Sequence, residues 1–376
     1  MRRGGDLQYS FVATLKKRGF IVHIFDYDKN CPCRDIADYF HLISIDEKEK
    51  ILQIVKQYKP IAITTTACEV GNISACYVAQ KLGLHSNSYE TALNTTNKAK
   101  MKEIFLINNI PTAKCVKISN ISEIRIDDIT YPIVIKPTDR SAGRGVSLIC
   151  NKDEFVDKFE LAMRESYSKE VLIEEVMQGK QYSIETISCH ANHQIVAYTE
   201  EYIDDSGNFI ETQQLIPARL NGQNSQKLHN LTMKLLNAFD IKYGACHIEV
   251  KLTNEGFKVI ELASRMGGWR DKLVKLAYDD DYNEALIDST LGISPTIKHL
   301  GQNYGLVKLM YSQLDYDFYN KIKNETPKII FGDSVKPFTC KNANNLAQAN
   351  GYYYISIPRN GDIDYYINGT MSKKCK

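Results

Sequence analysis

The stretch from 247 to 270 constrains the fold more than any other, because two short alternating runs surround a turn sequence. His247–Leu252 and Phe257–Leu262 have the spacing of two β-strands, and the Asn-Glu-Gly sequence between them is typical of a hairpin turn. In a hairpin closed by this turn, Glu249 lies almost opposite Glu261. The sequence therefore predicts two neighbouring carboxylates on adjacent strands.

Two carboxylates side by side repel each other unless a cation lies between them. Such pairs suit Mg²⁺ held against nucleotide phosphates, because Mg²⁺ prefers oxygen ligands. Arg265, a few residues beyond the second strand, adds a fixed cation that suits a phosphoryl group. The alternative is a surface hairpin with solvated charges, and the hairpin by itself leaves both interpretations open.

Length and composition exclude several classes of protein. The chain has 376 residues, which is enough for two or three domains, and it is 43% hydrophobic and 24% charged, as in ordinary globular proteins. Its net charge of +2 gives no reason to expect nucleic acid or an anionic membrane as a partner. No apolar run approaches about 18 residues and no signal peptide precedes Leu7, so we expect a soluble cytoplasmic protein. Cys31 and Cys33 have no second pair at zinc-site spacing, so we expect no structural metal site.

Residues 1–90 alternate between helical and strand patterns, which predicts a parallel α/β sheet. The predicted elements are helices at Phe11–Arg18, Ile51–Tyr58 and Asn72–Leu82 and strands at Phe20–Phe25 and Ile61–Thr66. A first strand would normally precede Gly4 and Gly5; either that strand is absent or the true start lies upstream, so a nucleotide site there has little support. Loops after strands bind ligands in such sheets. Asp26, Asp28 and Glu69 are either contacts of that kind or solvated loop residues.

A loop of small residues, D-R-S-A-G-R-G, lies between the predicted strands Ile133–Lys136 and Val146–Cys150. Successive backbone N–H groups in such a loop can cradle phosphate oxygens, because glycine and serine let the main chain come close. It is not a Walker loop, since no G-K-[ST] follows and a strand comes next. Lys136, at the strand end, is placed to reach the same phosphates. An ordinary hairpin loop is the alternative.

The segment Glu174–Gly179 follows a predicted strand and breaks into a loop beside apolar residues. Such a segment can hydrogen-bond the edge of an adenine through its backbone, while Val176 and Met177 contact the ring faces. A plain crossing between two strands is the alternative interpretation.

The remaining chain completes a mixed α/β pattern. Further strands are predicted at Ser183–Ile187 and Gln194–Tyr202, and helices at Asn97–Asn108, Asp153–Arg164, Ser225–Phe239, Leu273–Leu276 and Asn283–Leu291. An acidic triplet at Asp279–Asp281 either meets a substrate amine or is solvated. From Ile293 onward the strands are rich in tyrosine, and we interpret this part as a smaller β-rich subdomain without a catalytic motif.

The order of these signals resembles one family. N-K-A-K-M at Asn97–Met101, V-I-K-P at Val134–Pro137, S-A-G-R-G, E-E-V-M-Q-G-K-Q-Y-S-I-E and H-I-E…E-L-A-S-R-M-G-G resemble the ATP-grasp superfamily in order and spacing. The resemblance covers roughly residues 10–300 and includes a preceding α/β domain like those of biotin carboxylase and purine-pathway enzymes.

The resemblance implies three parts. They are a preceding domain at 1–93, an ATP-grasp domain at 94–292 with a small subdomain (94–175) and a large one (176–292), and a C-terminal subdomain at 293–376.

The resemblance also implies roles for individual residues. The expected ATP contacts are Lys98, Lys136, Ser141, Gly143, Gly145, Val146, Glu174, Glu175, Val176, Met177 and Gln181. Gln181 stands where the family usually has a ribose-binding glutamate. Glu249 and Glu261 match carboxylates that bridge Mg²⁺, with Mn²⁺ as an alternative. Ala263 stands where the family often has an asparagine as a third ligand, so the number of metal ions stays open.

The implied chemistry is phosphoryl transfer from ATP to a carboxylate, followed by attack of an amine on the acyl phosphate. Lys136 and Arg265 would neutralise the transferred phosphoryl group. Gly267 and Gly268 would offer backbone N–H groups to the tetrahedral oxyanion. Trp269 and Arg270 are candidates for the acceptor pocket.

Three functions are compatible with this pattern. The first is a carboxylate–amine ligase, similar to L-amino-acid ligases, with small-molecule carboxylate and amine substrates. The second is a carboxylase or carboxyaminoimidazole-type synthase that activates bicarbonate. The third is a nucleotide-binding regulatory protein without catalysis. We expect no nucleic acid or membrane as partner, and the oligomeric state stays open, with a homodimer as one possibility.

Overall fold

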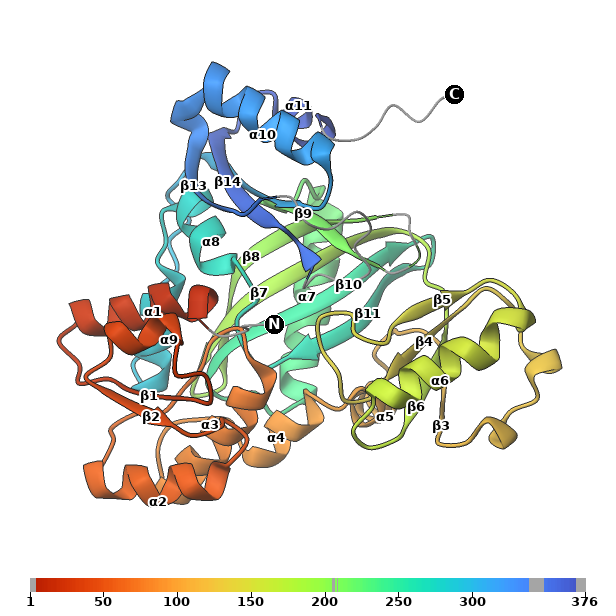
Figure 1. Ribbon diagram of the computed structural model, residues 1–376, viewed down its shortest axis with the longest axis horizontal. Helices are drawn as coiled ribbons and strands as arrows, with labels where there is room; N and C mark the ends of the chain where they lie inside the picture. The colour runs from red at the N-terminus through yellow and green to blue at the C-terminus, as the bar shows by residue number, and fades with distance from the viewer. Residues whose placement is uncertain (1–4, 205–206, 208, 338–347, 370–376) are drawn as a thin grey trace.

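The computed structural model describes residues 5–204, 207, 209–337 and 348–369. The described residues form three sheets in three lobes (Figure 1). A two-stranded parallel sheet lies in the N-terminal lobe, a four-stranded antiparallel sheet lies in a projecting small lobe, and an eight-stranded antiparallel sheet forms the centre. The predicted mixed α/β and α+β architecture is confirmed.

In the N-terminal lobe, helices cover both faces of a short pair of parallel strands. Its elements are α1 (Gly5–Lys17), β1 (His23–Asp26), β2 (Tyr39–Leu42), α2 (Lys48–Tyr58), α3 (Glu69–Leu82) and α4 (Tyr89–Asn94). Val12 and Leu15 of α1 pack with Ile24, whereas Leu52 and Val55 of α2 pack with Phe25 on the opposite face. The period-two alternation of β1 therefore determines which helix covers which face.

The predicted strand at Ile61–Thr66 is wrong. Its β-branched composition favours a strand, but these residues form no ladder with β1. A strand exists only where a neighbour supplies backbone partners, and here the side chain of Gln8 donates to the carbonyl of Thr66 at 2.7 Å. The predicted helices on either side, at Ile51–Tyr58 and Asn72–Leu82, are confirmed within α2 and α3.

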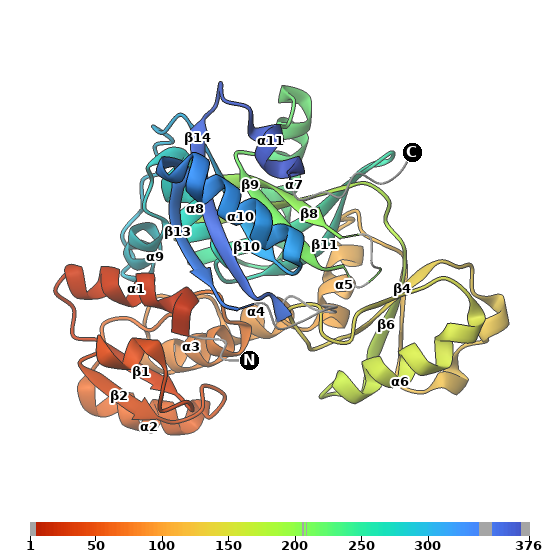
Figure 2. The same cartoon turned by 45° about the horizontal axis from the view of Figure 1, so that its top comes forward.

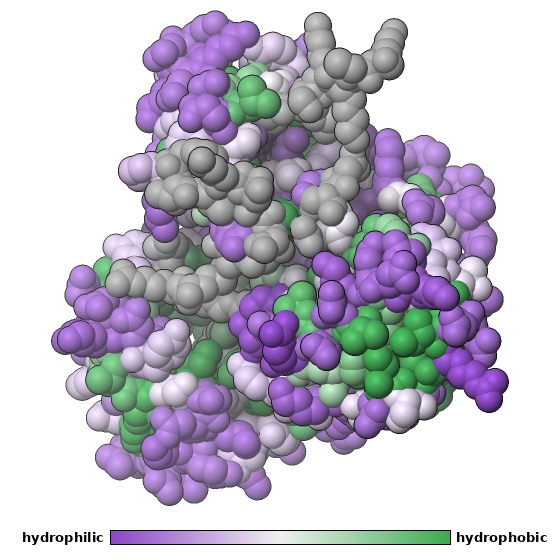
Figure 3. Space-filling model, turned by 45° about the vertical axis from the view of Figure 1, so that its right-hand side comes forward, coloured by the Kyte–Doolittle hydropathy of each residue, from purple (hydrophilic) through white to green (hydrophobic). Residues whose placement is uncertain are grey.

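The small lobe is a sheet covered by one amphipathic helix. Its elements are α5 (Lys98–Ile107), which leads into it, β3 (Cys115–Ile118), β4 (Ile133–Pro137), β5 (Ser147–Ile149), α6 (Phe155–Glu165) and β6 (Val171–Glu175). Phe155 and Phe159 of α6 pack on Ile133 and Ile135 of β4. Hydrophobic side chains also gather on one outer face of this lobe (Figure 3).

The central sheet has the strand order β11-β10-β7-β8-β9-β12-β14-β13. Its strands are β7 (Lys180–Cys189), β8 (Asn192–Ile203), β9 (Glu211–Ile216), β10 (Gly244–Thr253), β11 (Gly256–Ala263), β12 (Asn303–Met310), β13 (Ile330–Val335) and β14 (Gly351–Pro358). The tyrosine-rich strands β12 to β14 thus continue the same sheet, because β12 pairs with β9.

Helices cover both faces of this sheet. They are α7 (Gly222–Ala238), α8 (Arg270–Tyr278), α9 (Tyr282–Thr290), α10 (Gln313–Glu325) and α11 (Ile363–Asn368). Leu228 and Leu235 of α7 pack on Ile184 and Ile248, whereas α8 and α9 pack on the face that carries Ile187. Figure 2 shows α10 at the β12–β14 end of the sheet, where its buried residues meet those strands.

Alternation along the strands places the charged residues of the centre. Ile248 faces α7, so Glu249 points to the opposite face of the sheet. The register pairs Glu249 with Glu261, and the bulge directly after Glu249 leaves this pairing intact, so the predicted juxtaposition is confirmed. Among the described residues, no helix is long and apolar enough to cross a membrane.

Candidate active site

The hairpin carboxylates lie at the cleft between the three lobes. Their side chains are 24% and 20% exposed, and Lys98 Nζ lies 2.8 Å from Glu261 Oε2. Burial would raise the pKa of Glu261, but Lys98 lowers it below the usual value. Burial and the neighbouring Glu261 carboxylate raise the pKa of Glu249. A hairpin with freely solvated charges does not have such partners, so that alternative is wrong.

Lys98 joins the metal-site hairpin to the small-residue loop. Asn97 caps α5 by accepting the N–H groups of Ala99 and Lys100 at 3.0 Å each, so the helix begins at Lys98. Lys98 Nζ also donates to the carbonyl of Arg140 at 3.0 Å. One ammonium group therefore contacts both Glu261 and the loop that was predicted to cover phosphates.

Lys136 lies on β4 of the small lobe and pairs with Glu174. Strand β4 runs beside β6, and Lys136 Nζ lies 2.7 Å from Glu174 Oε2. A second lysine, Lys102, lies 3.1 Å from Glu174 Oε1. The expected adenine segment thus begins at a buried carboxylate that contacts two lysines. Sequence reasoning assigned Glu174 through its main chain only and did not identify Lys102.

The small-residue loop has the backbone that a phosphate cradle needs. Ala142, Gly143 and Gly145 have φ values of 57°, 68° and 73°, and consecutive left-handed residues turn successive N–H groups toward one side. A Cβ at Gly145 would lie 2.8 Å from Pro137 Cγ, so only glycine fits there. Ser141 lines the cleft and its carbonyl accepts from Arg144 Nε at 3.2 Å.

The remaining predicted nucleotide contacts lie along the next stretch of chain. Val146 closes the loop by donating to the Gly143 carbonyl at 3.2 Å. Val176 and Met177 are half-buried and follow the end of β6. Glu175 pairs with Lys258 at 3.3 Å, and its N–H donates to the carbonyl of Lys114.

Gln181 lies beside the hairpin carboxylates. Its Nε2 donates to Glu201 at 2.8 Å and to Glu249 at 3.3 Å.

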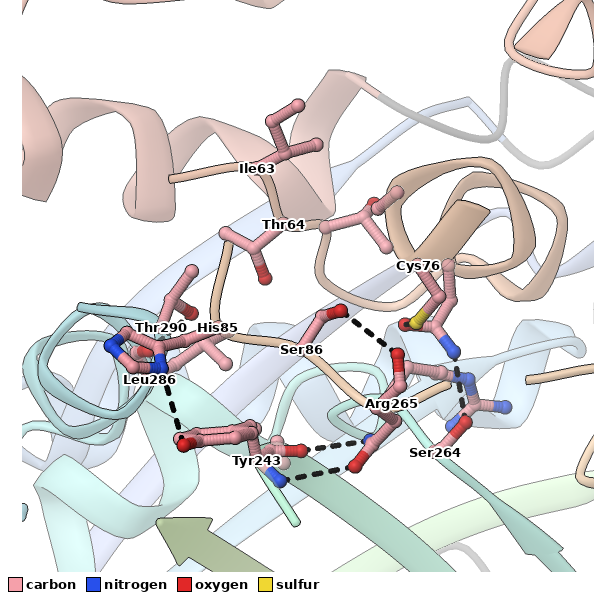
Figure 4. A pocket seen from close by; sticks show the side chains of 16 residues that line it. Ile63, Thr64, Cys76, His85, Ser86, Tyr243, Ser264, Arg265, Leu286 and Thr290 are labelled. Carbon is pink, nitrogen blue, oxygen red and sulfur yellow. Dashed lines mark hydrogen bonds between the residues drawn. The ribbon is translucent and has the colours of Figure 1, made fainter. Parts of the chain in front are cut away.

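Arg265 pairs with a carboxylate from the N-terminal lobe. Its Nη2 and Nε lie 2.5 and 3.1 Å from Glu69 Oε1, at the start of α3. The sequence suggested Glu69 only as one of several loop carboxylates. Behind Arg265 lies a polar cavity of about 30 Å³, lined also by Cys76, Ser264 and Tyr243 (Figure 4). On the Glu69 side lies a larger cavity of about 370 Å³.

The larger cavity is the main opening of the candidate site, and all three lobes contribute to it. Its lining residues include Tyr27 and Glu69 from the N-terminal lobe, Arg140 and Tyr167 from the small lobe, and Glu261 from the central sheet. A small molecule in this cavity would contact Glu261 and the end of the small-residue loop together.

Arg270 is sealed inside the protein. Its side chain is 1% exposed, and it contacts Glu185 at 3.3 Å and Glu201 at 2.6 Å. The N–H of Gly267 donates to Glu185 at 3.1 Å, so in this structure that N–H is already engaged and does not form an open oxyanion site. No Gly268 N–H contact is described. Arg270 and Gly267 were expected to face a substrate. In this structure both contact Glu185 inside the protein instead.

Trp269 is partly buried and packs against a hydrophobic core cluster. Its ring lies 5.7 Å from that of Tyr352 in an edge-on arrangement, and it borders the cluster that covers α8 and α9. Its φ of 63° is in the left-handed region. Among the described residues, its buried Nε1 has no hydrogen-bond partner.

Sequence reasoning missed a buried charge network on the same face of the sheet. His247 Nδ1 lies 2.5 Å from Glu185 Oε1, and its Nε2 lies 3.2 Å from Glu249 Oε1. Burial disfavours the imidazolium, yet Glu185 raises the pKa of His247 to about 10. Burial and the adjacent Glu201 carboxylate raise the pKa of Glu211. The alternation of polar residues in Q-Y-S-I-E was the one available signal.

The acidic triplet has structural roles. Asp279 pairs with Lys275 at 2.7 Å, Asp280 accepts the N–H groups of Lys298 and His299, and Asp281 caps α9. Its carboxylates are therefore occupied, and the interpretation as a binding site for an amine has no support.

The residues present suit ATP and a divalent cation. Within the described part of the chain no group of three or more His, Cys, Asp or Glu side chains could hold a metal ion. Two facing carboxylates beside Lys98 instead match a cation that shares its remaining positions with phosphates and water, as Mg²⁺ commonly does.

Residues 129–272 match the ATP-grasp domain family. Among curated proteins, the chain is similar to alanine–anticapsin ligase of Bacillus subtilis (strain 168), with 25% identity over 291 residues, 68% of this chain and 61% of that protein. It is also similar to formate-dependent phosphoribosylglycinamide formyltransferase of Prochlorococcus marinus (strain NATL1A), with 28% identity over 46% of this chain and 45% of that protein. The chain thus spans only 45% and 61% of these two relatives.

Solved structures share the fold over nearly the whole chain. L-amino acid ligase from Bacillus licheniformis has a TM-score of 0.77 at 16% identity and covers 96% of this chain and 93% of its own. N5-carboxyaminoimidazole synthetase from Staphylococcus aureus, complexed with ADP, has a TM-score of 0.78 at 18% identity and covers 97% and 95%. The motif order and the family match agree that residues 129–272 form an ATP-grasp domain, and the fold over nearly the whole chain is like that of these solved structures.

Proposed function

We propose that this chain is an ADP-forming ligase that activates a carboxylate as an acyl phosphate and couples it to an amine. The observation that carries the proposal is the pairing of Glu249 with Glu261, with Lys98 bound to Glu261 at 2.8 Å. Similarity to alanine–anticapsin ligase and to L-amino acid ligase supports it. A homodimer and a cytoplasmic location are predictions from the sequence.

The chain's own residues would supply position and charge. Mg²⁺ held by Glu249 and Glu261 would neutralise the phosphate oxygens of ATP. Lys136 and Arg265 would exchange their present partners, Glu174 and Glu69, for phosphoryl oxygens. Phosphoryl transfer needs alignment and charge neutralisation more than covalent help, so this set of residues suits the reaction. The small-residue loop would then exclude water from the acyl phosphate.

An amino acid is the substrate class that the charges of the inner face favour. Four carboxylates, those of Glu185, Glu201, Glu211 and Glu249, lie around two cations, His247 and Arg270. Among the described residues, Glu211 Oε1 accepts no hydrogen bond and lies 3.8 Å from Arg270 Nη2. Burial and neighbouring carboxylates raise the pKa of Glu211 and Glu249, so a cation beside these two groups would favour their ionised forms, and an amino acid would bring an ammonium group beside its reacting carboxylate.

The test is a screen of proteinogenic amino acids in pairs. Purified protein, ATP and Mg²⁺ are combined with each pair, released phosphate is followed, and the product is identified by mass spectrometry. We expect phosphate release only with particular pairs, together with a dipeptide or amide. The Glu261→Gln variant gives the background rate.

Two other outcomes would contradict the proposal. Stimulation by bicarbonate with an aminated ribonucleotide, and by no amino acid, would identify the bicarbonate-activating alternative. Tight ATP binding without turnover in the presence of any acceptor would identify a nucleotide-binding protein without catalysis.

A further inference from the structure

Two lysines share one buried glutamate at the edge of the nucleotide site. Lys136 Nζ lies 2.7 Å from one oxygen of Glu174, and Lys102 Nζ lies 3.1 Å from the other. The side chain of Lys136 is 7% exposed, and those of Lys102 and Glu174 are each 4% exposed. Two ammonium groups and one carboxylate leave one net positive charge in a place with little solvent.

Lys102 is held away from the cleft. Its Nζ donates to Thr112 Oγ1 at 2.6 Å, and Thr112 Oγ1 in turn donates to the carbonyl of Val259 on β11 at 2.7 Å. Lys98, one turn earlier on α5, lines the 370 Å³ cavity, whereas neither Lys102 nor Lys136 does. What distinguishes Lys102 from Lys136 is that its Nζ is also held by the Thr112 hydroxyl, which ties it to β11.

The net charge of Lys102, Lys136 and Glu174 indicates how Lys102 affects Lys136. With Lys102 in place, Glu174 is shared between two ammonium groups, and its attraction for Lys136 is weaker. Without Lys102, Lys136 and Glu174 would form a neutral buried pair, and charges at such distances attract strongly when water is excluded. Lys136, on which the Glu261 carboxylate also acts, would then have to leave that pair to contact ATP.

We propose that Lys102 is a positioning residue for Lys136, which occupies Glu174 so that Lys136 can turn toward the phosphates of ATP. The inference concerns nucleotide binding by the ATP-grasp domain, so it stands apart from the identity of the acid and amine substrates. Lys102 acts through Glu174 and touches neither ATP nor the acceptor.

The experiment measures binding of ATP and of adenosine by calorimetry, with Mg²⁺ and without any acceptor. We expect Lys102→Met to weaken ATP binding by about tenfold or more, because Lys136 stays on Glu174, and to leave adenosine binding within about twofold. The double variant Lys102→Met/Glu174→Gln should restore ATP binding to within about threefold of the native protein, since the amide no longer holds Lys136. Lys102→Arg should keep most of the native affinity.

Lys100→Met is the matched control, because Lys100 is exposed on the same helix and should leave both affinities unchanged. Equal losses for ATP and adenosine in Lys102→Met, or a double variant as weak as the single one, would overturn the inference and leave Lys102 a packing residue. If Lys102→Met does not fold, Lys102→Gln carries the test, because its amide can still contact the Thr112 hydroxyl while the charge is removed. We expect the same loss of ATP affinity, about tenfold or greater, in that variant, and native ATP affinity would overturn the inference.

Discussion

Two clusters of glutamates lie on the same face of the central sheet and have opposite characters. Glu249 and Glu261 are about a quarter to a fifth exposed; Glu261 lines the cleft and pairs with Lys98, and Glu249 contacts His247 and Gln181. Glu185 and Glu201 lie deeper, are 0% and 2% exposed, and are tied to Arg270. Glutamates of the open pair can therefore bind a metal ion and phosphates, whereas glutamates of the sealed pair stabilise the fold.

The difference follows from what covers each end of the strands. Helices α8 and α9 close over the inner cluster, and Tyr282 of α9 donates to the carbonyl of Thr186 at 2.9 Å and contacts Glu185. The hairpin end instead lies at the cavity between the lobes, which Glu261 and Ala263 line. Carboxylates that meet solvent can take a cation and phosphates, whereas sealed carboxylates need permanent partners.

The largest effect should come from breaking the sealed cluster. Arg270→Met removes the cation from Glu185 and Glu201 and leaves buried carboxylates unpaired, which should lower the free energy of unfolding by about 3–5 kcal/mol. Urea unfolding measures it. Lys275→Met is the control, since Lys275 is exposed on the same helix and its pair with Asp279 should contribute under about 1 kcal/mol. Equal stability of the two variants would show that the inner cluster is not a structural unit.

Breaking the open cluster should spare the fold and reduce turnover. Glu261→Gln keeps the shape of the side chain but removes a charge that holds the metal and phosphates, so ATP turnover should fall by at least about a hundredfold. Phosphate release measures turnover, and thermal unfolding checks the fold. Glu255→Gln, at the exposed tip of the same hairpin, should have native turnover. Near-normal turnover in Glu261→Gln would refute the metal assignment.

Lys308 differs from both glutamate clusters, because it is a buried charged group that forms no ion pair with a carboxylate among the described residues. Lys308 is 2% exposed and donates to the carbonyls of Tyr366 and Ile367 at 2.6 and 3.3 Å, and burial lowers its pKa to about 7. The unfolded chain keeps this proton up to about pH 10.4. Between these values the unfolded state binds more protons, so the free energy of unfolding should rise with pH.

The size of this pH effect is the smallest of the three. Relative to Lys308→Met, the native protein should gain roughly 1 kcal/mol of stability per pH unit between pH 7 and pH 10. Urea unfolding of both proteins at several pH values gives the difference. Parallel pH profiles for the two proteins would mean that Lys308 does not lose its proton in the folded state.

Local pattern predicted the parts that depend on one stretch of chain. The alternation around the Asn-Glu-Gly turn placed Glu249 opposite Glu261, and the register confirms it. The helices of the N-terminal lobe were predicted for the same reason, since their apolar spacing is local. The strand at Ile61–Thr66 failed because a strand also needs a neighbour with free backbone groups, which composition does not report.

The sequence by itself determined which family the chain resembles and which faces of its strands carry charge, because motif order and period-two alternation are properties of the chain alone. The tertiary structure decided which charges meet. Glu69 contacts Arg265 across 196 positions of sequence. Lys102 on helix α5 contacts Glu174 on strand β6. Arg270 was expected at a pocket and lies sealed in the core. Partners of this kind are chosen by the packing of distant elements, and no local pattern encodes that packing.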